Sequence, residues 1–215
     1  MTRYVMVADL RRCVGCQTCT ASCRHANATP PDVQWRQVLD FEIGEFPEVR
    51  RTFVPVGCMH CGDPPCEHVC PTTATRQRSD GLVTIDYDLC IGCGYCAVAC
   101  PYQARHIVRR PRFAYGAKRT ESEEKRFDEH RMSVATKCSF CVDRIDEAGK
   151  RGLTPGVDPE VTPACVNACI TGTLSFGDRD DPESTVSKLL GSTVHFRMHE
   201  ELGTEPGMYY VWDAK

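Results

Sequence analysis

Sixteen cysteines constrain this chain more than any other feature of its sequence. They make up about 7% of the 215 residues and fall into four groups of four. Within each group the thiols recur at short intervals, so sulfur chemistry is expected to organise the fold. The groups are Cys13, Cys16, Cys19 and Cys23; Cys58, Cys61, Cys66 and Cys70; Cys90, Cys93, Cys96 and Cys100; and Cys138, Cys141, Cys165 and Cys169.

The spacing within the groups points to iron–sulfur clusters. The first and third groups share the pattern C-x2-C-x2-C-x3-C, and Pro101 follows the third. This is the pattern with which bacterial ferredoxins hold [4Fe–4S] clusters, where three thiolates of one loop bind one cluster and the fourth binds its neighbour. The second group is closely related and is followed by Pro71, and residues 142–164 divide the fourth group into two pairs. Sixteen cysteines thus predict four [4Fe–4S] clusters with none left over.

Disulfides, zinc sites and histidine ligands are the alternatives. Disulfides suit small secreted chains, but cysteines here occupy the positions where a signal peptide needs an apolar core. Zinc knuckles pair two C-x2-C units across a loop and have no use for a third and fourth cysteine beside them. Histidine ligation needs histidines at ligand positions, whereas His60 and His68 lie between cysteines. Clusters are favoured, and mixed zinc and cluster sites or disulfides stay open as minor alternatives.

An internal repeat predicts the fold class. Tyr4–Asp9 and Leu82–Asp86 are strand-like runs that lead into the first and third groups, and short helices are expected over Cys19–Asn27 and Cys96–Tyr102. Strand, cysteine loop and helix form half of a two-cluster ferredoxin. We therefore expect an α+β chain of two bacterial-ferredoxin-like modules, each with two [4Fe–4S] clusters.

The interval between groups predicts which halves pair. Only residues 71–89 separate the second and third groups, which suits a hairpin inside one compact module. The expected inner module covers residues 58–101. It is nested inside an outer module of residues 1–57 and 102–177 that carries long loop inserts, and residues 178–215 form a C-terminal extension.

Exchange of the fourth cysteine between the halves of each module gives four expected ligand sets. These are Cys13, Cys16, Cys19 and Cys169 for cluster 1; Cys23, Cys138, Cys141 and Cys165 for cluster 2; Cys58, Cys61, Cys66 and Cys100 for cluster 3; and Cys70, Cys90, Cys93 and Cys96 for cluster 4. Gly15 and Gly92 lie between ligands, where the backbone must turn tightly.

The connecting segments carry weaker signals. Residues 24–57 are apolar enough to pack over the clusters, and residues 142–164 resemble a loop because they are rich in Gly and Pro. The aromatic run at residues 208–212 predicts a core strand or, less strongly, an edge that faces a partner.

The basic residues near the cysteines have two interpretations. The run Arg105, Arg109, Arg110 and Arg112 is interpreted as a solvated face, with a docking surface as the alternative. Arg12, Arg24 and Lys137 adjoin ligands and would raise cluster potentials, or they serve only as surface charges.

Composition excludes several classes of function. The formal net charge of −3 excludes a strongly basic nucleic-acid binder. No apolar run approaches the roughly 18 residues of a membrane-spanning helix. The sequence carries no P-loop, dinucleotide fingerprint or nucleophile elbow. The chemistry expected of the chain alone is electron transfer without a catalytic site.

At the cysteine motifs the chain resembles a known family. CVGCQTCTASC, CMHCGDPPCEHVCPT, CIGCGYCAVACPY and KCSFCVDRI…PACVNACITG occur in the order found in the four-cluster iron–sulfur subunits of DMSO reductase-type molybdenum enzymes. Relatives serve polysulfide, thiosulfate and tetrathionate reductases. The resemblance implies a relay between a large catalytic subunit with a molybdopterin guanine dinucleotide cofactor, next to the outer module, and a membrane anchor that exchanges electrons with quinone, next to the inner module.

Two other functions remain as alternatives. The chain would then be a subunit of a soluble two-subunit molybdenum enzyme resembling a transhydroxylase, or a free-standing polyferredoxin shuttle. Without a signal or a spanning segment in the sequence, the expected location is the cytoplasm, including the membrane surface through partners. The family resemblance also allows export together with a catalytic partner that carries a twin-arginine signal.

Overall fold

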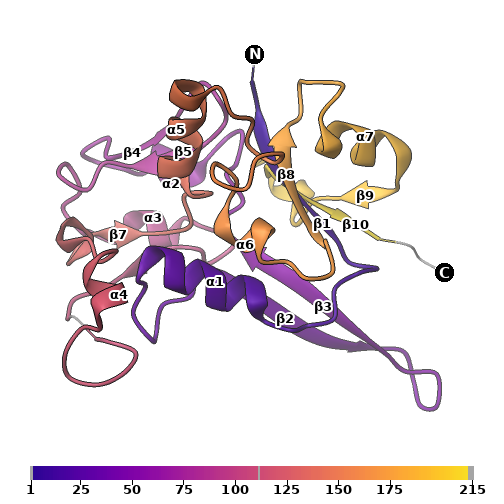
Figure 1. The fold of residues 1–215 in the computed structure, drawn as a ribbon, viewed down its shortest axis with the longest axis horizontal. Helices are drawn as coiled ribbons and strands as arrows, with labels where there is room; N and C mark the ends of the chain where they lie inside the picture. Colours follow the sequence, from indigo (N-terminus) through magenta and orange to yellow (C-terminus); the bar gives the residue numbers. More distant parts are fainter. Residues whose placement is uncertain (1, 111, 213–215) are drawn as a thin grey trace.

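The computed structural model describes residues 2–110 and 112–212, and short elements joined by cysteine-bearing loops make up the chain (Figure 1). The strands are β1 (Tyr4–Asp9), β2 (Arg36–Ile43), β3 (Arg50–Gly57), β4 (Thr75–Gln77), β5 (Val83–Ile85), β6 (His106–Ile107), β7 (Ala135–Thr136), β8 (Leu174–Asp178), β9 (His195–Phe196) and β10 (Met208–Val211). The helices are α1 (Thr18–Asn27), α2 (Pro65–His68), α3 (Tyr95–Val98), α4 (Glu121–Glu124), α5 (Val142–Arg151), α6 (Ala164–Asn167) and α7 (Thr185–Ser192), with 3-10 turns at Glu129–Arg131 and Glu200–Leu202.

A four-stranded sheet in the order β8-β1-β10-β9 joins the two ends of the chain. β1 pairs antiparallel with β8 and parallel with β10. Met6 and Ala8 of β1 belong to the core that contains the cysteines, whereas Val5 and Val7 pack with Val186 of α7 on the other face. Because both faces of β1 are covered, its sequence is a continuous apolar run without alternation.

The strand predicted for the aromatic run near the C-terminus is confirmed as a core strand. β10 is buried along its whole length, and the Tyr210 hydroxyl donates a hydrogen bond to the Pro55 carbonyl at the end of β3. The last part of the chain thus holds the β2–β3 hairpin against the sheet.

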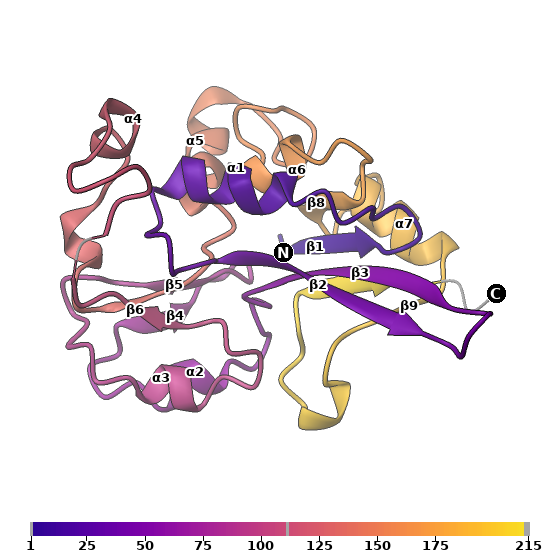
Figure 2. The same cartoon turned by 90° about the horizontal axis from the view of Figure 1, so that it is seen from below.

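The helices that carry cysteines lie in two pairs. α1 packs against α6, and α2 packs against α3; Figure 2 shows the first pair along the upper side and the second pair along the lower side. In all four helices, the third cysteine of a group is the second helical residue: Cys19, Cys66, Cys96 and Cys165. The hairpin expected between the second and third groups is present as β4 and β5.

Two local predictions need correction. The helix expected over Cys96–Tyr102 ends at Val98. Residues 142–164 are not a loop throughout, because the first ten form α5, which buries Ile145 and Ala148 on one face and ends before Gly152 in the left-handed conformation. The Gly and Pro residues that suggested a loop lie mostly beyond the last turn of this helix. None of the helices in residues 2–110 and 112–212 has the length and apolar character needed to cross a bilayer.

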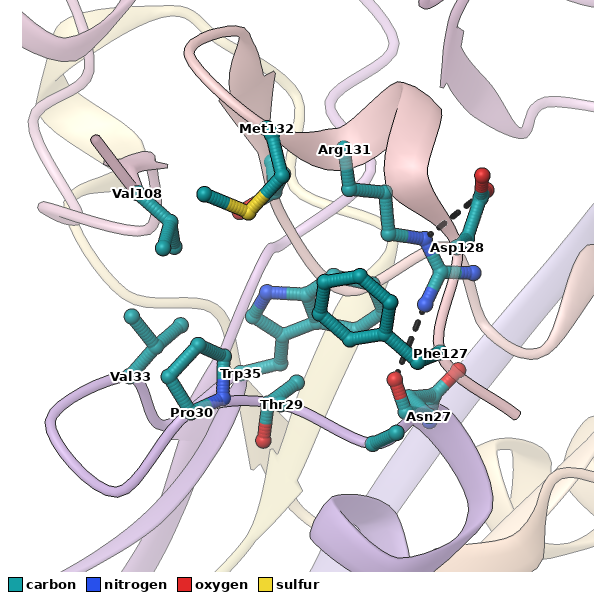
Figure 3. Close-up of a pocket in the computed structure, with 12 residues that line it drawn as sticks. Asn27, Thr29, Pro30, Val33, Trp35, Val108, Phe127, Asp128, Arg131 and Met132 are labelled. Atoms are coloured by element: carbon teal, nitrogen blue, oxygen red, sulfur yellow. Dashed lines mark hydrogen bonds and ion pairs between the residues drawn. The ribbon is translucent and has the colours of Figure 1, made fainter. Parts of the chain in front are cut away.

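The inserts pack against each other beside α1. Trp35 is buried, and the Arg131 guanidinium lies 5.1 Å from its ring centre. Figure 3 shows this contact at a cavity lined by residues 27–30, Val33 and Trp35 together with Val108, Phe127 and Met132. The cavity holds about 20 Å³, which is room for a water molecule rather than an organic substrate.

Removal of the Tyr210 hydroxyl is expected to destabilise the sheet. Tyr210→Phe leaves the Pro55 carbonyl without this donor in a buried position, at a cost of about 1–3 kcal/mol. The thermal unfolding midpoint of the iron-loaded protein should fall by several degrees. Tyr115→Phe, at an 83% exposed tyrosine, is the matched control and should leave it unchanged. Equal midpoints for the two variants would contradict the prediction.

Candidate metal centres

Set 1 gathers thiols from both ends of the cysteine-bearing chain: Cys13, Cys16, Cys19 and Cys169. The first two follow β1, the third is the second residue of α1, and the last lies just beyond α6. Burial raises the pKa of the Cys13 thiol, and negative charge on the other three raises it further. These four thiols are therefore electrostatic neighbours.

Set 2 is the most deeply buried. Cys23 lies on α1, Cys138 and Cys141 precede α5, and Cys165 lies on α6. Burial raises the pKa of the Cys23 thiol well above its ordinary value, and the charges of the other three raise it further. Burial also raises the pKa of Cys138 and of Cys165 to about 11 each.

Set 3 brings together the second group and the end of the third. Cys58 and Cys61 follow β3, Cys66 lies on α2, and Cys100 follows α3. Burial raises the pKa of the Cys61 thiol to about 12, with further contributions from Cys58, Cys66 and Cys100.

Set 4 lies beside set 3. Cys70 follows α2, Cys90 and Cys93 lie in the loop after β5, and Cys96 lies on α3. Burial raises the pKa of the Cys96 thiol, Arg105 lowers it, and the charges of Cys90, Cys93 and Cys70 raise it.

Two glycines let the backbone turn within sets 1 and 4. Gly15 and Gly92 have φ values of +67° and +64°, which a residue with a side chain adopts only with strain. A Cβ atom would also collide with the Phe53 ring at Gly15 and with the Ser133 carbonyl oxygen at Gly92. The tight turns expected from the sequence are present at both positions.

The second and fourth groups end in the same local structure. Cys70 and Cys169 are each followed two residues later by a threonine whose hydroxyl lies 3.9 and 3.8 Å from the sulfur. Burial raises the pKa of both thiols, but hydrogen bonds from backbone N–H groups and from the threonine outweigh it and leave each pKa below its ordinary value. The absence of a proline after Cys169 therefore does not change how this thiol is held.

The sets follow one another in a row. Charge on Cys19 of set 1 acts on Cys165 of set 2, and charge on Cys58 of set 3 acts on Cys138 of set 2. Sets 3 and 4 meet where Cys66 and Cys96 pack in one cluster with Val83 and Ala135. Among the sixteen cysteines only Cys16 and Cys93 are exposed, one in each terminal set.

Three buried cations lie among the thiols. Arg36, Lys137 and Arg105 are 1%, 2% and 6% exposed. Within the described residues their hydrogen-bond partners are sulfur, a hydroxyl and backbone carbonyls rather than carboxylates. The interpretation of Arg105 as part of a solvated basic run is wrong, although Arg109 and Arg110 are exposed. Sequence reasoning missed Arg36, because only its tertiary neighbours bury it.

The donor chemistry fits an anionic iron–sulfur group. Each set offers four thiols, and a [4Fe–4S] cluster with four thiolates carries a charge of about −2 when oxidised. A buried guanidinium without a counter-charge is costly, so negative sulfur is the partner that Arg36 and Arg105 require. When bound, such a cluster accepts and releases one electron at a time.

His60 has a packing role. Its Nε2 donates to the Cys138 carbonyl at 3.0 Å, its Nδ1 accepts from the Val83 N–H at 3.0 Å, and its ring stacks on Phe140 with centres 3.8 Å apart. Burial holds the pKa of this histidine well below its ordinary value, so the neutral ring fits these bonds.

Comparison with known families identifies the domain type. Two family models, both described as a 4Fe-4S dicluster domain, match residues 12–74 and 49–112. The first match spans the first and second cysteine groups, and the second spans the second and third. The chain therefore contains tandem ferredoxin-like 4Fe-4S dicluster domains.

Relatives match over nearly the whole chain. A selenate reductase subunit of Mesobacillus selenatarsenatis is 39% identical over 97% of this chain and 72% of that protein. A putative dimethyl sulfoxide reductase iron-sulfur subunit of Halobacterium salinarum is 38% identical over 98% of this chain and 79% of its own length. A tetrathionate reductase subunit of Salmonella typhimurium is 37% identical over 97% of this chain and 72% of its own length.

The cysteine groups, the tandem dicluster domains and the full-length similarity lead to one conclusion. The chain belongs to the family of iron–sulfur electron-transfer subunits of DMSO reductase-type molybdenum oxidoreductases, and it is a non-catalytic subunit of such a complex.

Proposed function

We propose that the chain binds four [4Fe–4S] clusters, one in each thiol set, and passes electrons along the row from one end to the other. Cluster 1 lies in set 1, cluster 2 in set 2, cluster 3 in set 3 and cluster 4 in set 4. The proposal is supported by the electrostatic grouping of the sixteen thiols into four sets of four.

The same geometry supports the nested arrangement of modules. α1 and α6 carry ligands of sets 1 and 2, whereas α2 and α3 carry ligands of sets 3 and 4. The matching surroundings of Cys70 and Cys169 make the second and fourth groups equivalent halves. In this proposal residues 58–101 form the inner module, residues 1–57 and 102–177 form the outer module, and residues 178–215 extend the outer one.

The row of thiol sets reaches the surface at its two ends. Cys16 and Cys93 are the exposed thiols, at opposite ends, while the thiols of sets 2 and 3 are buried or half-buried. Electron transfer needs short gaps, so partners must dock where a terminal set reaches the surface. A relay between two different partners follows from two exposed ends and a buried middle.

Apolar side chains surround both ends. Val14 and Ile170 are next to cysteines of set 1 in the sequence, and Ile91, Tyr95 and Val98 lie within two residues of cysteines of set 4; all are more than half exposed. The β2–β3 hairpin, with Phe46 93% exposed at its tip, projects on the side away from α3 (Figure 1). Exposed apolar surface of this kind marks docking sites.

The proposed partners follow from the family. At set 1 the partner is a large catalytic subunit with molybdopterin guanine dinucleotide, and at set 4 it is a membrane anchor that exchanges electrons with quinone. The relatives are named as subunits of selenate, dimethyl sulfoxide and tetrathionate reductases, and no one of these substrates is assigned to this chain. The proposed location is the cytoplasm, at the membrane surface through the anchor. Exposed apolar side chains at both ends of the row favour a stable complex with two partners over a free-standing shuttle.

The metal content of the purified protein should match four cubane clusters. Sixteen thiolates hold 16 irons and 16 acid-labile sulfides per chain, with no ligand left over. Iron, zinc and sulfide analysis of anaerobically purified protein measures this. Stoichiometric zinc, or about 8 irons per chain, would contradict the proposal.

Substitution of one exposed ligand should affect one cluster. Cys93→Ser replaces a thiolate of set 4 by an oxygen, which binds iron more weakly, so this cluster should become a three-iron form while the other three keep their EPR spectra. Cys16→Ser is the matched variant in set 1. An unchanged spectrum for Cys93→Ser, or a change in the cluster that Cys16→Ser also alters, would overturn the assignment.

The two ends should bind different partners. Phe46→Ser on the hairpin should weaken co-purification with a large molybdenum-containing subunit at least tenfold, because buried aromatic anchors dominate interfaces. Val98→Ser beside set 4 should instead weaken attachment to the membrane subunit and slow electron exchange with quinone. Val157→Ser, at an exposed valine of the loop after α5, is the control and should change neither. Loss of the same partner in the first two variants would contradict two separate docking ends.

A further inference from the structure

The three buried cations are distributed along the row of thiol sets. Each contacts or acts on thiols of two successive sets: Arg36 on sets 1 and 2, Lys137 on sets 2 and 3, and Arg105 on sets 3 and 4. Three gaps in the row thus hold three positive charges, none of which is paired with a carboxylate among the described residues.

Arg36 occupies the gap between sets 1 and 2. Its Nη2 donates to the Met6 sulfur at 2.9 Å and its Nη1 to the Met208 sulfur at 3.4 Å, and its charge lowers the pKa of the Cys165 thiol against the effect of burial. The Nε atom is buried without a hydrogen-bond partner in the described structure. Thioethers are weak acceptors, so little in the chain other than the thiols compensates this charge.

The thiols around Arg36 belong mainly to set 2. Burial lowers the pKa of its guanidinium, and the negative charges that Cys165, Cys138 and Cys23 carry as thiolates more than offset this. On the other side of the gap, Arg36 lowers the pKa of the Cys19 thiol of set 1 against the effect of burial. Arg36 therefore acts on both sets, through three thiols of set 2 and one of set 1.

Arg105 occupies the gap between sets 3 and 4. Its Nη2 donates to the Cys66 sulfur at 2.7 Å and its Nη1 to the Thr75 hydroxyl at 3.2 Å. Cys66, Cys58 and Cys96 are the thiols whose charges act on it. It is therefore in direct contact with set 3 and in electrostatic contact with set 4.

Lys137 occupies the middle gap. Its Nζ donates to the carbonyl oxygens of Val83 and of Cys138, the latter at 2.9 Å. Burial and the charge of Arg105 lower the pKa of this lysine, whereas negative charge on Cys58 and Cys66 in set 3 and on Cys138 in set 2 raises it. The two carbonyls fix the ammonium group between the two sets.

We propose that Arg36, Lys137 and Arg105 are potential-setting residues, each of which raises the reduction potentials of the two clusters that flank it. The inference rests on the proposed function, because it requires a cluster in each set. A fixed positive charge stabilises an added electron on either side, and the effect is strong in a buried, low-dielectric site.

A positive charge placed between two clusters also favours electron transfer between them. An electron that crosses a gap leaves one cluster and enters the next, and the arginine gains or loses neither a proton nor an electron, since its guanidinium stays protonated. The shared cation stabilises the electron on either of the two clusters. It therefore raises both reduction potentials together and does not oppose transfer between the clusters. It also weakens the repulsion between two reduced, negatively charged neighbours.

Redox titration of charge-neutral variants tests this proposal. In Arg105→Gln the cluster in set 3 should become harder to reduce, with at least a tenfold change in its one-electron equilibrium, equivalent to about 59 mV. The reduction potential of the cluster in set 4 should shift in the same direction but by less, and that of the cluster in set 1 should not change. Arg36→Gln should give the reverse pattern, with the largest shift in set 2, a smaller one in set 1 and none in set 4.

The titration uses the complete iron-loaded chain and is followed by EPR. The signals of sets 1 and 4 are assigned with Cys16→Ser and Cys93→Ser, and iron and sulfide are counted before each titration. Arg36→Lys and Arg105→Lys, which keep the charge, should restore the potentials. Arg151→Gln, at an exposed arginine that ends α5, is the control and should change the reduction potential of no cluster.

The outcomes separate the inference from the proposed function. Fewer than four clusters in the unsubstituted protein would refute the proposed function. The inference alone would be refuted if the protein holds four clusters but the reduction equilibria of the fully loaded variants change less than tenfold. Equal shifts of the reduction potential at all four clusters would also refute it. If Arg36→Gln does not retain iron, Arg105→Gln and Lys137→Gln still test the inference. Each of these variants must lower the reduction potentials of the two clusters that flank the substituted residue.

Discussion

The balance between buried positive charge and sulfur is the interaction on which the rest of the structure depends. Arg36 is buried, with thioethers and thiols around it and no carboxylate among its partners in the described chain. Burial of an uncompensated charge costs several kcal/mol, and the buried thiols, whose pKa values rise to about 11 or 12, do not supply negative charge at neutral pH. Because iron binding converts thiols to thiolates, we expect metal binding and folding to be coupled in this chain.

The same coupling explains why such short elements suffice. α2, α3 and α6 have four residues each, far below the length at which a helix is stable alone. The cysteines on these helices belong to sets that also include thiols from distant loops. The sheet supplies the remaining support, since β1 lies between β8 and β10 and ties the first residues of the chain to the last.

Sequence reasoning succeeded where the signal is local. The strand at Tyr4–Asp9, the hairpin between the second and third groups and the turns at Gly15 and Gly92 all follow from a few adjacent residues. It failed where tertiary contacts decide. Arg105 belongs to the same basic run as the exposed Arg109 and Arg110, and it is tertiary contacts, including those with Cys66 and Thr75, that distinguish it. The ligand exchange between groups could be predicted because the ferredoxin spacing encodes it, and it remains a proposal for the cysteine tests.

Exposure divides the control of potential between the chain and its partners. Sets 2 and 3 lie among buried residues, where water does not screen the fixed charges of Arg36, Lys137 and Arg105. Sets 1 and 4 reach the surface at Cys16 and Cys93, where water weakens the same interactions. A partner that docks on the apolar rim removes this water and adds charges of its own. If the proposed clusters and partners are correct, we expect this chain alone to tune the interior of the row, and each end to acquire its working potential only within the complex.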